Sequence, residues 1–215
     1  MSNFKNDWID NEVVFHHQLE LNLKQIATMG DYPQHWLIFI DFVNRFEPRN
    51  ILDIGCGCGI YYELCKKHLN VQYTGIDCSE DAAKLAIETW NYDNFFAKGY
   101  EELTAEYIEQ FDLIHAGAML DVLPNGDEAL EFLLSLSPKA FLIGRVKLTD
   151  KPSYYEAFTA YNDSIFSYRF YHNETNFLQL CAKNNYIVHH QGERGVDNFY
   201  LRKAGERKKC NDRKN

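Results

Sequence analysis

Four residues within the segment 51–59 combine polar chemistry with regular spacing: Asp53, Gly55, Gly57 and Gly59. The apolar residues around Asp53 indicate a buried strand of a parallel sheet, and those after Gly59 indicate a helix. Glycine at such a turn lets a ligand approach the main chain, and the helix start offers free N–H groups. An acid two residues before the first glycine favours a ligand that carries a positive charge.

The spacing of the glycines argues against a dinucleotide ligand. A dinucleotide-binding loop needs the pattern G-x-G-x-x-G, but the third glycine of that pattern falls on Ile60 in one register and on Tyr62 in the other. Asp53 would also repel a pyrophosphate. The alternative interpretation is a glycine-rich turn between a strand and a helix that holds no ligand.

The pattern D-x-G-x-G-x-G at residues 53–59 resembles motif I of the class I S-adenosylmethionine-dependent methyltransferases. The resemblance covers about residues 35–203 and is most specific over 51–90. It implies S-adenosylmethionine as the cofactor, with its amino-acid end in this loop. Cys56, inside the loop, is then a cofactor-binding residue together with Asp53 and the three glycines.

Two further positions fit the rest of the cofactor. Asp77 follows the glycine loop by about 20 residues, the spacing of a βαβ unit, and a carboxylate there can accept hydrogen bonds from both ribose hydroxyls. The resemblance implies the same role, with Cys78 along the ribose or adenine edge; the alternative is that Asp77 caps the next helix beside Ser79. Many relatives next carry an acid for the adenine, whereas this chain has Tyr100, so we expect Tyr100 and Glu101 at the adenine.

The segment 111–115 matches the F-D-L-I motif of the family and ends in a histidine. The resemblance implies that His115 and Ala116 flank the methionine part of the cofactor. Asp112, at the start of this strand, is expected to have a structural role.

Methyl transfer is an in-line displacement, for which an enzyme mainly aligns and desolvates the reactants. A hydroxyl acceptor also needs a base that takes its proton. His115 is the first candidate, because the carboxyl ends of strands line the crevice of such folds, and Asp121 is the second. The alternatives are a histidine that orients the loop and an acid that only makes a helix polar.

Aromatic residues gather in the stretch 152–171, which interrupts the alternation of strands and helices. In the family this region commonly forms the wall on the acceptor side, so Tyr154, Tyr155 and His172 are predicted to bind the substrate. The alternative is a surface insertion that is packed by its own rings. His35, on an N-terminal helix, is either a further pocket residue or an ordinary helix residue.

The remaining elements predict an α/β fold with a doubly wound, seven-stranded, mostly parallel sheet, preceded by N-terminal helices at 10–29 and 34–46. After the first strand at Ile51, the predicted strands are 71–76, 94–97, 111–115, 139–144, 186–191 and 198–202. The resemblance implies that the last strand lies antiparallel between the fifth and the sixth.

The 215 residues suggest a single methyltransferase domain at 1–203, made of a helical cap at 1–47 and an α/β core at 48–203. The basic segment 204–215 is expected to be a disordered tail. The apolar N-terminal helices either cover the pocket or pair with a second subunit, which leaves a homodimer open.

Composition limits the partners. A net charge of -9 argues against a nucleic-acid partner, and no apolar run reaches the roughly 18 residues of a membrane span. The N-terminus lacks the features of a signal peptide, so we expect a cytoplasmic protein. The six cysteines include no C-x-x-C pair, and we therefore expect no metal site.

These observations favour a methyltransferase that uses S-adenosylmethionine and acts on a small-molecule or sugar-type acceptor. Two alternatives remain. One is a non-catalytic partner protein that binds S-adenosylmethionine, and the other is an enzyme of the same fold that transfers a group other than methyl.

Overall fold

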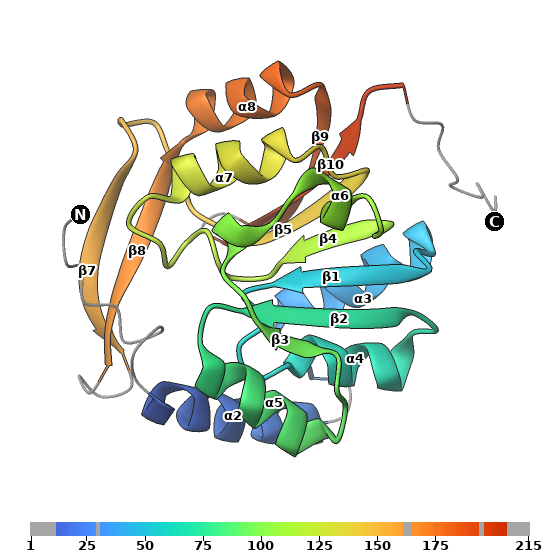
Figure 1. Cartoon of the computed structure of the whole chain (residues 1–215). Coiled ribbons are helices and arrows are strands. Elements are labelled where there is room, and N and C mark those ends of the chain that lie inside the picture. Colours follow the sequence, from blue (N-terminus) through green and yellow to red (C-terminus); the bar gives the residue numbers. More distant parts are fainter. Residues whose placement is uncertain (1–11, 29–30, 161–164, 194–195, 206–215) are drawn as a thin grey trace.

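The computed structural model describes residues 12–28, 31–160, 165–193 and 196–205 (Figure 1). Two helices precede the first strand: α2 (Glu12–Ala27) and α3 (Gln34–Phe46). They correspond to the two predicted N-terminal helices, except that residues 10, 11 and 29 of the first prediction lie outside the described residues.

Seven strands form one sheet in the order β3-β2-β1-β4-β5-β10-β9. The first five are parallel to one another, whereas β10 is antiparallel to both β5 and β9. The predicted sheet and the predicted position of the last strand are therefore confirmed. The strands are β1 (Asn50–Ile54), β2 (Gln72–Asp77), β3 (Phe95–Ala97), β4 (Leu113–Ala116), β5 (Ala140–Val146), β9 (Tyr186–Glu193) and β10 (Val196–Lys203).

Helices connect the strands and cover both faces of the sheet (Figure 1). Ser79 caps the helix α5 (Glu80–Trp90), because its Oγ accepts a hydrogen bond from the backbone N–H of Ala82 at 3.3 Å. The other helices after β1 are α4 (Ile60–His68), the short 3-10 helix η1 (Tyr100–Glu102), α6 (Ala105–Ile108), α7 (Gly126–Ser135) and α8 (Glu174–Lys183).

Each face of the sheet has its own apolar core, because successive residues of a strand point to opposite faces. Ile51 of β1 and Leu113 of β4 pack with side chains of α3 and α4. Leu52 of β1 and Ile114 of β4 pack instead with side chains of α7 and α8. Asp53 lies two residues after Ile51, and therefore belongs to the face that α3 and α4 cover.

The aromatic stretch 152–171, which interrupts the alternation of strands and helices, contributes to a second sheet. This sheet contains β6 (Leu148–Thr149), β7 (Tyr154–Ala160) and β8 (Ile165–Asn173), in the order β6-β8-β7. The strands β7 and β8 pair antiparallel. Figure 1 places this pair beyond the arrowheads of β1 and β2, so it stands over the edge of the main sheet where the parallel strands end.

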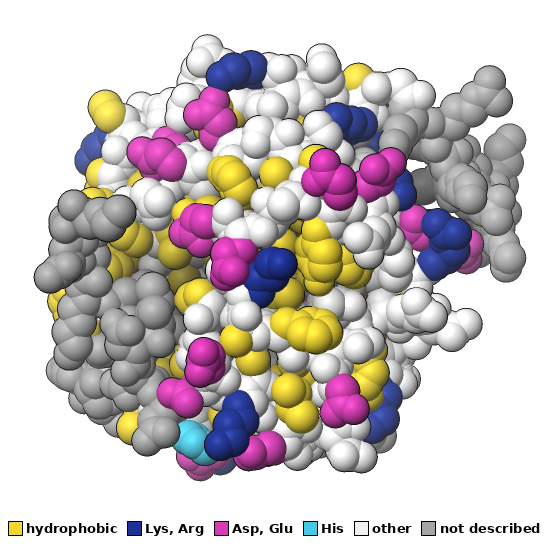
Figure 2. All heavy atoms as spheres, viewed as in Figure 1, with side chains coloured by type: hydrophobic (Ala, Val, Ile, Leu, Met, Phe, Trp, Pro, Cys, Tyr) yellow, Lys and Arg dark blue, Asp and Glu magenta, His cyan; other side chains and the backbone are white. Residues whose placement is uncertain are grey.

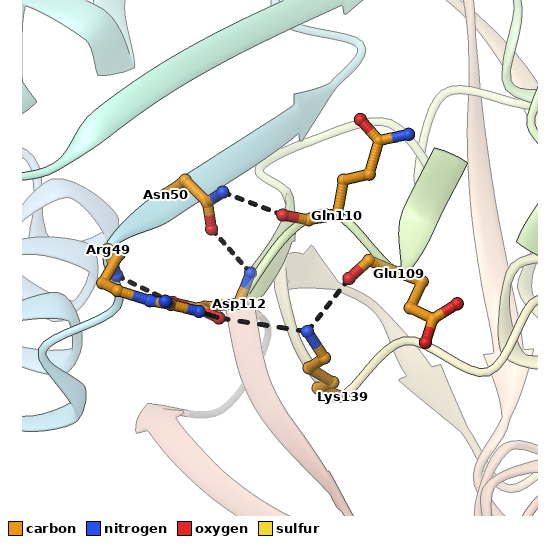
Figure 3. A network of polar contacts seen from close by, with 6 residues as sticks. All are labelled: Arg49, Asn50, Glu109, Gln110, Asp112 and Lys139. Carbon is orange, nitrogen blue, oxygen red and sulfur yellow. Dashed lines mark hydrogen bonds and ion pairs between the residues drawn. The ribbon is translucent and has the colours of Figure 1, made fainter. Parts of the chain in front are cut away.

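The opposite edge of the sheet carries the polar network of Figure 3. Arg49 donates to both carboxylate oxygens of Asp112, through Nε at 2.8 Å and a terminal nitrogen at 3.0 Å. Asn50 Oδ1 accepts from the backbone N–H of Asp112 at 2.9 Å, and its amide nitrogen donates to the carbonyl of Gln110. These contacts tie the start of β1 to the start of β4, which is the structural role predicted for Asp112.

This network predicts a pH dependence of stability. Hydrogen bonds from Arg49 lower the pKa of Asp112 below its ordinary value of 3.8. A carboxyl group whose pKa is lower in the folded state stabilises the fold above pH 3.8, and that contribution is lost as the pH falls through the folded-state pKa. The difference in free energy of unfolding between the unaltered protein and Asp112→Asn should therefore shrink below pH 3.8, and a constant difference from pH 7 to pH 2 would contradict this.

Among the described helices, none is both long and apolar enough to cross a membrane. Most of the predicted tail, from residue 206 onward, lies outside the described residues.

Candidate active site

A cavity of about 580 Å³ lies where the parallel strands of the main sheet end. In open α/β sheets, ligands bind at this edge, and the volume is that of a typical small-molecule site. The walls come from the segments that follow β1, β2, β3, β4 and β5, from α2 and α3, and from the β7–β8 pair. The cavity therefore joins the predicted cofactor loop to the predicted acceptor side.

The three glycines of the loop all have a backbone that favours glycine, with φ of 70° at Gly55, 52° at Gly57 and 78° at Gly59. Gly55 and Gly57 line the cavity, whereas Gly59 does not. A Cβ atom at Gly57 would lie 2.5 Å from Oε1 of Gln18 on α2. The loop thus needs glycine for its conformation, whereas the end of the Gln18 side chain could move aside.

Asp77 ends β2 and is buried in the cavity wall. Its Oδ2 accepts from the backbone N–H of Gly57 at 2.8 Å, and its Oδ1 accepts from that of Ser79 at 3.0 Å. Burial raises the pKa of Asp77 from its ordinary value, and the two backbone hydrogen bonds oppose this. The residue thus makes the capping contact considered from the sequence and also faces the cavity, where a ribose hydroxyl could still donate to either oxygen.

The other predicted residues of the adenosine end line the same cavity: Cys78, Tyr100 and Glu101. Burial, together with the charge of Asp77, raises the pKa of the Cys78 thiol to about 12, so this thiol is neutral at physiological pH. Tyr100 lies on η1 and its ring contacts Phe132 of α7 edge to face, with ring centroids 6.0 Å apart.

Asp53 and His115 form a buried polar cluster with Tyr73 rather than part of the cavity wall. Nδ1 of His115 lies 2.8 Å from Oδ1 of Asp53, and the hydroxyl of Tyr73 donates to Oδ2 of Asp53 at 2.5 Å. All three side chains are at most 2% exposed. The rings of Phe39 and Tyr61 pack against the imidazole, with centroids 4.7 and 4.3 Å away.

This arrangement bears on two predictions, His115 as a base and Asp53 as a direct cofactor contact, and both stay predictions. Neither side chain is among those that line the cavity, and the imidazole is enclosed by protein. The alternative that the sequence left open, a histidine that orients the loop, agrees with these contacts.

The remaining predicted cofactor residues, Cys56 and Ala116, are also buried outside the cavity wall. The sulfur of Cys56 packs beside Gly75, and Ala116 belongs to the core between the sheet and α7 and α8. Neither side chain lines the cavity, so the structure gives no evidence for direct contact with a cofactor.

Asp121, the second predicted base, does line the cavity. Its side chain is 3% exposed, and Lys147 Nζ donates to its Oδ2 at 2.9 Å. Its other oxygen, Oδ1, is buried without a hydrogen-bond partner among the described residues. An unsatisfied buried carboxylate oxygen is costly, so Oδ1 has unused capacity to accept a hydrogen bond.

The substrate residues predicted on the β7–β8 pair are not placed at the cavity. Tyr154 stacks on Tyr171, with centroids 4.7 Å apart, and Tyr155 is 42% exposed. His172 is fully buried, with Nδ1 2.6 Å from Oδ1 of Asp127 on α7. The surface-insertion alternative therefore describes these residues better, because they pack against one another or against α7.

Other residues line the cavity instead, and most of them were not predicted from the sequence. They are Phe158, Tyr168 and Arg169 of the β7–β8 pair, Arg145 and Lys147 at the end of β5, and Gln18 and Asn22 of α2. His35, considered from the sequence, lines it too. The position of Arg145 and Lys147 after a parallel strand was the signal that could have found them.

Comparison with known proteins agrees with this geometry. Residues 26–191 match a family model described as "Methyltransferase domain". The chain is 33% identical over 91 residues to the ubiquinone biosynthesis O-methyltransferase of Nitrosospira multiformis, covering 40% of this chain and 38% of that protein. It is 28% identical over 86 residues to an rRNA N(6)-adenosine-methyltransferase of Caenorhabditis elegans, covering 40% of each. The matches thus span less than half the length of these curated relatives.

A solved structure shows the same fold. The 1,6-didemethyltoxoflavin-N1-methyltransferase of Burkholderia thailandensis, with 1,6-didemethyltoxoflavin and S-adenosylhomocysteine bound, superposes with a TM-score of 0.57 at 18% identity. The superposition covers 90% of this chain and 85% of that one.

The strand order, with an antiparallel last strand and a cavity at the carboxyl edge of the sheet, is that of the class I S-adenosylmethionine-dependent methyltransferase fold. Since the family model matches well over half of the chain, the protein belongs to the methyltransferase domain family. This membership, and the S-adenosylhomocysteine bound in the neighbouring structure, agree with the methyltransferase and the cofactor predicted from the sequence.

Proposed function

We propose that this methyltransferase acts on a small-molecule acceptor, and that Asp121 takes the proton when the acceptor atom is a hydroxyl oxygen. The observation that carries the proposal is the single cavity that the glycine loop and Asp121 both line. A ligand at the loop and an acceptor at Asp121 would share one space.

The loop end of the cavity suits the cofactor. Gly55, Gly57 and Asp77 all line this end of the cavity. We assign Asp77 to the ribose hydroxyls, Tyr100 and Glu101 to the adenine, and the backbone of Gly55 and Gly57 to the amino-acid end. Asp53 and His115 are then positioning residues that hold the strands beneath the loop.

The acceptor end of the cavity suits a compact molecule. It is covered by α2 on one side and by Phe158 and Tyr168 of the β7–β8 pair on another, and these walls exclude water from the reaction. On the face that Figure 2 shows, Lys and Arg side chains are scattered among acidic ones and form no basic patch. That distribution and the net charge of -9 favour a small molecule over a nucleic acid. The O-methyltransferase named among the relatives supports the same class.

The proposed chemistry divides between the cofactor and this chain. When bound, S-adenosylmethionine supplies a methyl group on a positively charged sulfur. Asp121 Oδ1 accepts the proton of an acceptor hydroxyl, while Lys147 holds Oδ2 and fixes the orientation of the carboxylate. The surrounding walls hold the acceptor in line with the methyl group.

Cofactor binding is tested by Asp77→Asn. An amide at this position can accept only one of the two backbone hydrogen bonds, and it presents an amide N–H group where a ribose hydroxyl would donate. Hydrogen bonds to a charged group contribute about 1.5–3 kcal/mol, so we expect the affinity for S-adenosylhomocysteine, measured by calorimetric titration, to fall roughly 10- to 100-fold.

The matched control is Asp112→Asn, which makes the same chemical change at the opposite edge of the sheet and should leave that affinity unchanged. NAD serves as the control ligand and should not bind. Equal affinities of Asp77→Asn and of the unaltered protein would remove Asp77 from the cofactor site. Failure of folded, unaltered protein to bind S-adenosylhomocysteine would contradict the proposed function as a whole.

A further inference from the structure

Arg145, at the end of β5, has a backbone conformation that arginine rarely adopts. Its φ is 61°, in the left-handed region. Such a conformation is costly for a residue with a side chain, and such outliers cluster at functional sites. Glycine would adopt it without strain. The chain nevertheless has arginine here, which points to a use for the side chain.

A β-bulge produces this conformation. Ile143 pairs with Phe199 and Val146 pairs with Asp197, so two residues of β5 lie opposite the single residue Asn198 of β10. The buried side chain of Asn198 accepts, through Oδ1, a hydrogen bond from the backbone N–H of Arg145 at 3.3 Å. Bulges of this kind re-aim a side chain next to active sites, and here the side chain is part of the cavity wall.

Arg145 differs from the other cationic side chains of the cavity, because its side chain has no hydrogen-bond or ion-pair partner among the residues that the structure describes. Lys147 is paired with Asp121, Arg169 lies over the ring of Phe158 at 4.7 Å, and Lys98 lies over the ring of Tyr107 at 4.8 Å. Within the ranges that the structure describes, the guanidinium of Arg145 makes no hydrogen bond or ion pair.

His35, which also lines the cavity, adds no positive charge to that of Arg145. Burial, with smaller contributions from Arg145 and His115, lowers the pKa of His35 to about 4. His35 is therefore neutral at physiological pH and can share hydrogen bonds with a ligand, while Arg145 supplies the positive charge.

We propose that Arg145 binds an anionic group of the acceptor, so that the substrates of this enzyme are small molecules with a carboxylate or a phosphate. The planar guanidinium matches both anions with two parallel hydrogen bonds. A protein with a net charge of -9 repels anions in general, so a dedicated cation at the cavity wall is what such an acceptor requires. This inference rests on the proposed function, because it names the substrate class for the same site.

The test uses the full chain saturated with S-adenosylhomocysteine, in buffer without phosphate. Calorimetric titration compares 3-hydroxybenzoate with 3-hydroxybenzamide, and glucose 1-phosphate with methyl glucoside, each at up to about 10 mM. The variants are Arg145→Gly, which fits the left-handed backbone, and Arg145→Gln, which keeps much of the side-chain length. The control is Arg45→Gln, which removes an exposed arginine that pairs with Asp41 on α3.

We expect the unaltered protein and Arg45→Gln to bind at least one anion roughly tenfold more tightly than its neutral counterpart. Both Arg145 variants should lose that preference while still binding S-adenosylhomocysteine. The benzoate pair and the sugar pair separate a carboxylate from a phosphate. The proposal is overturned if no anion binds, if the neutral compounds bind equally well, or if the preference survives in Arg145→Gly. If the unaltered protein does not bind S-adenosylhomocysteine, that result would instead contradict the proposed function.

Discussion

Replacing Asp53 by alanine is expected to lower the free energy of unfolding by about 2–6 kcal/mol, because each of two buried polar groups left without its acceptor costs roughly 1–3 kcal/mol. The substitution leaves the imidazole of His115 and the hydroxyl of Tyr73 without their shared acceptor, in a region where each is at most 2% exposed. The measurement is urea unfolding of both proteins at pH 7, followed by circular dichroism.

A triple variant provides the control for Asp53→Ala. Asp53→Leu, His115→Phe and Tyr73→Phe together remove the carboxylate and both groups that bond to it, and replacing a buried polar set by apolar residues is often close to neutral. The triple variant should therefore be more stable than Asp53→Ala. If Asp53→Ala is as stable as the unaltered protein but no longer binds S-adenosylhomocysteine, the direct cofactor contact predicted from the sequence is correct and the positioning role is wrong.

Asp121→Asn is expected to lower kcat by a factor of about 10² to 10⁴ with a hydroxyl acceptor, the usual contribution of a general base. The amide keeps the shape of the side chain and can still accept from Lys147, but it cannot take a proton at the position of Oδ1. The measurement is the release of S-adenosylhomocysteine with the hydroxyl compound that the unaltered enzyme methylates fastest.

Two comparisons make this result specific. Asp112→Asn, at the far edge of the sheet, should keep the unaltered kcat, and the affinity of Asp121→Asn for S-adenosylhomocysteine should also stay unchanged. An amine that reaches the site neutral needs no base, so its methylation should be much less sensitive to Asp121→Asn. A hydroxyl acceptor that is methylated at the same rate by both proteins would contradict the role of Asp121.

The main sheet and the cofactor end of the cavity could be predicted from the sequence because their signals are local. The glycine spacing determines the turn after β1, and the apolar run that ends at Asp77 brings this acid to the same edge of the sheet. Parallel strands that alternate with helices leave few other arrangements. Gly55, Gly57, Asp77, Cys78, Tyr100 and Glu101 therefore line the cavity as the predicted cofactor site requires.

The acceptor end could not be predicted in the same way, because its geometry depends on contacts between distant segments. The conformation of Arg145 requires the bulge opposite Asn198, 53 residues further along the chain. Tyr154 and Tyr155 were chosen for their residue type, whereas the pairing of β7 with β8 places Phe158 and Tyr168 at the cavity. Similarly, only the alignment of β1 with β4 shows that His115 faces Asp53 rather than a substrate.

The buried cluster of Asp53, His115 and Tyr73 also bears on how the chain reaches its folded state. The three residues lie on three adjacent strands, β1, β4 and β2, and Asp53 is directly opposite His115. A slip of one residue between neighbouring strands would turn the slipped side chains to the other face. The apolar residues around this cluster would tolerate such a slip, since both faces of the sheet are apolar, but the carboxylate would then be buried without its partners. The cluster thus discriminates against misaligned sheets, and it selects the one alignment in which the carboxyl ends of the strands meet to form the cavity.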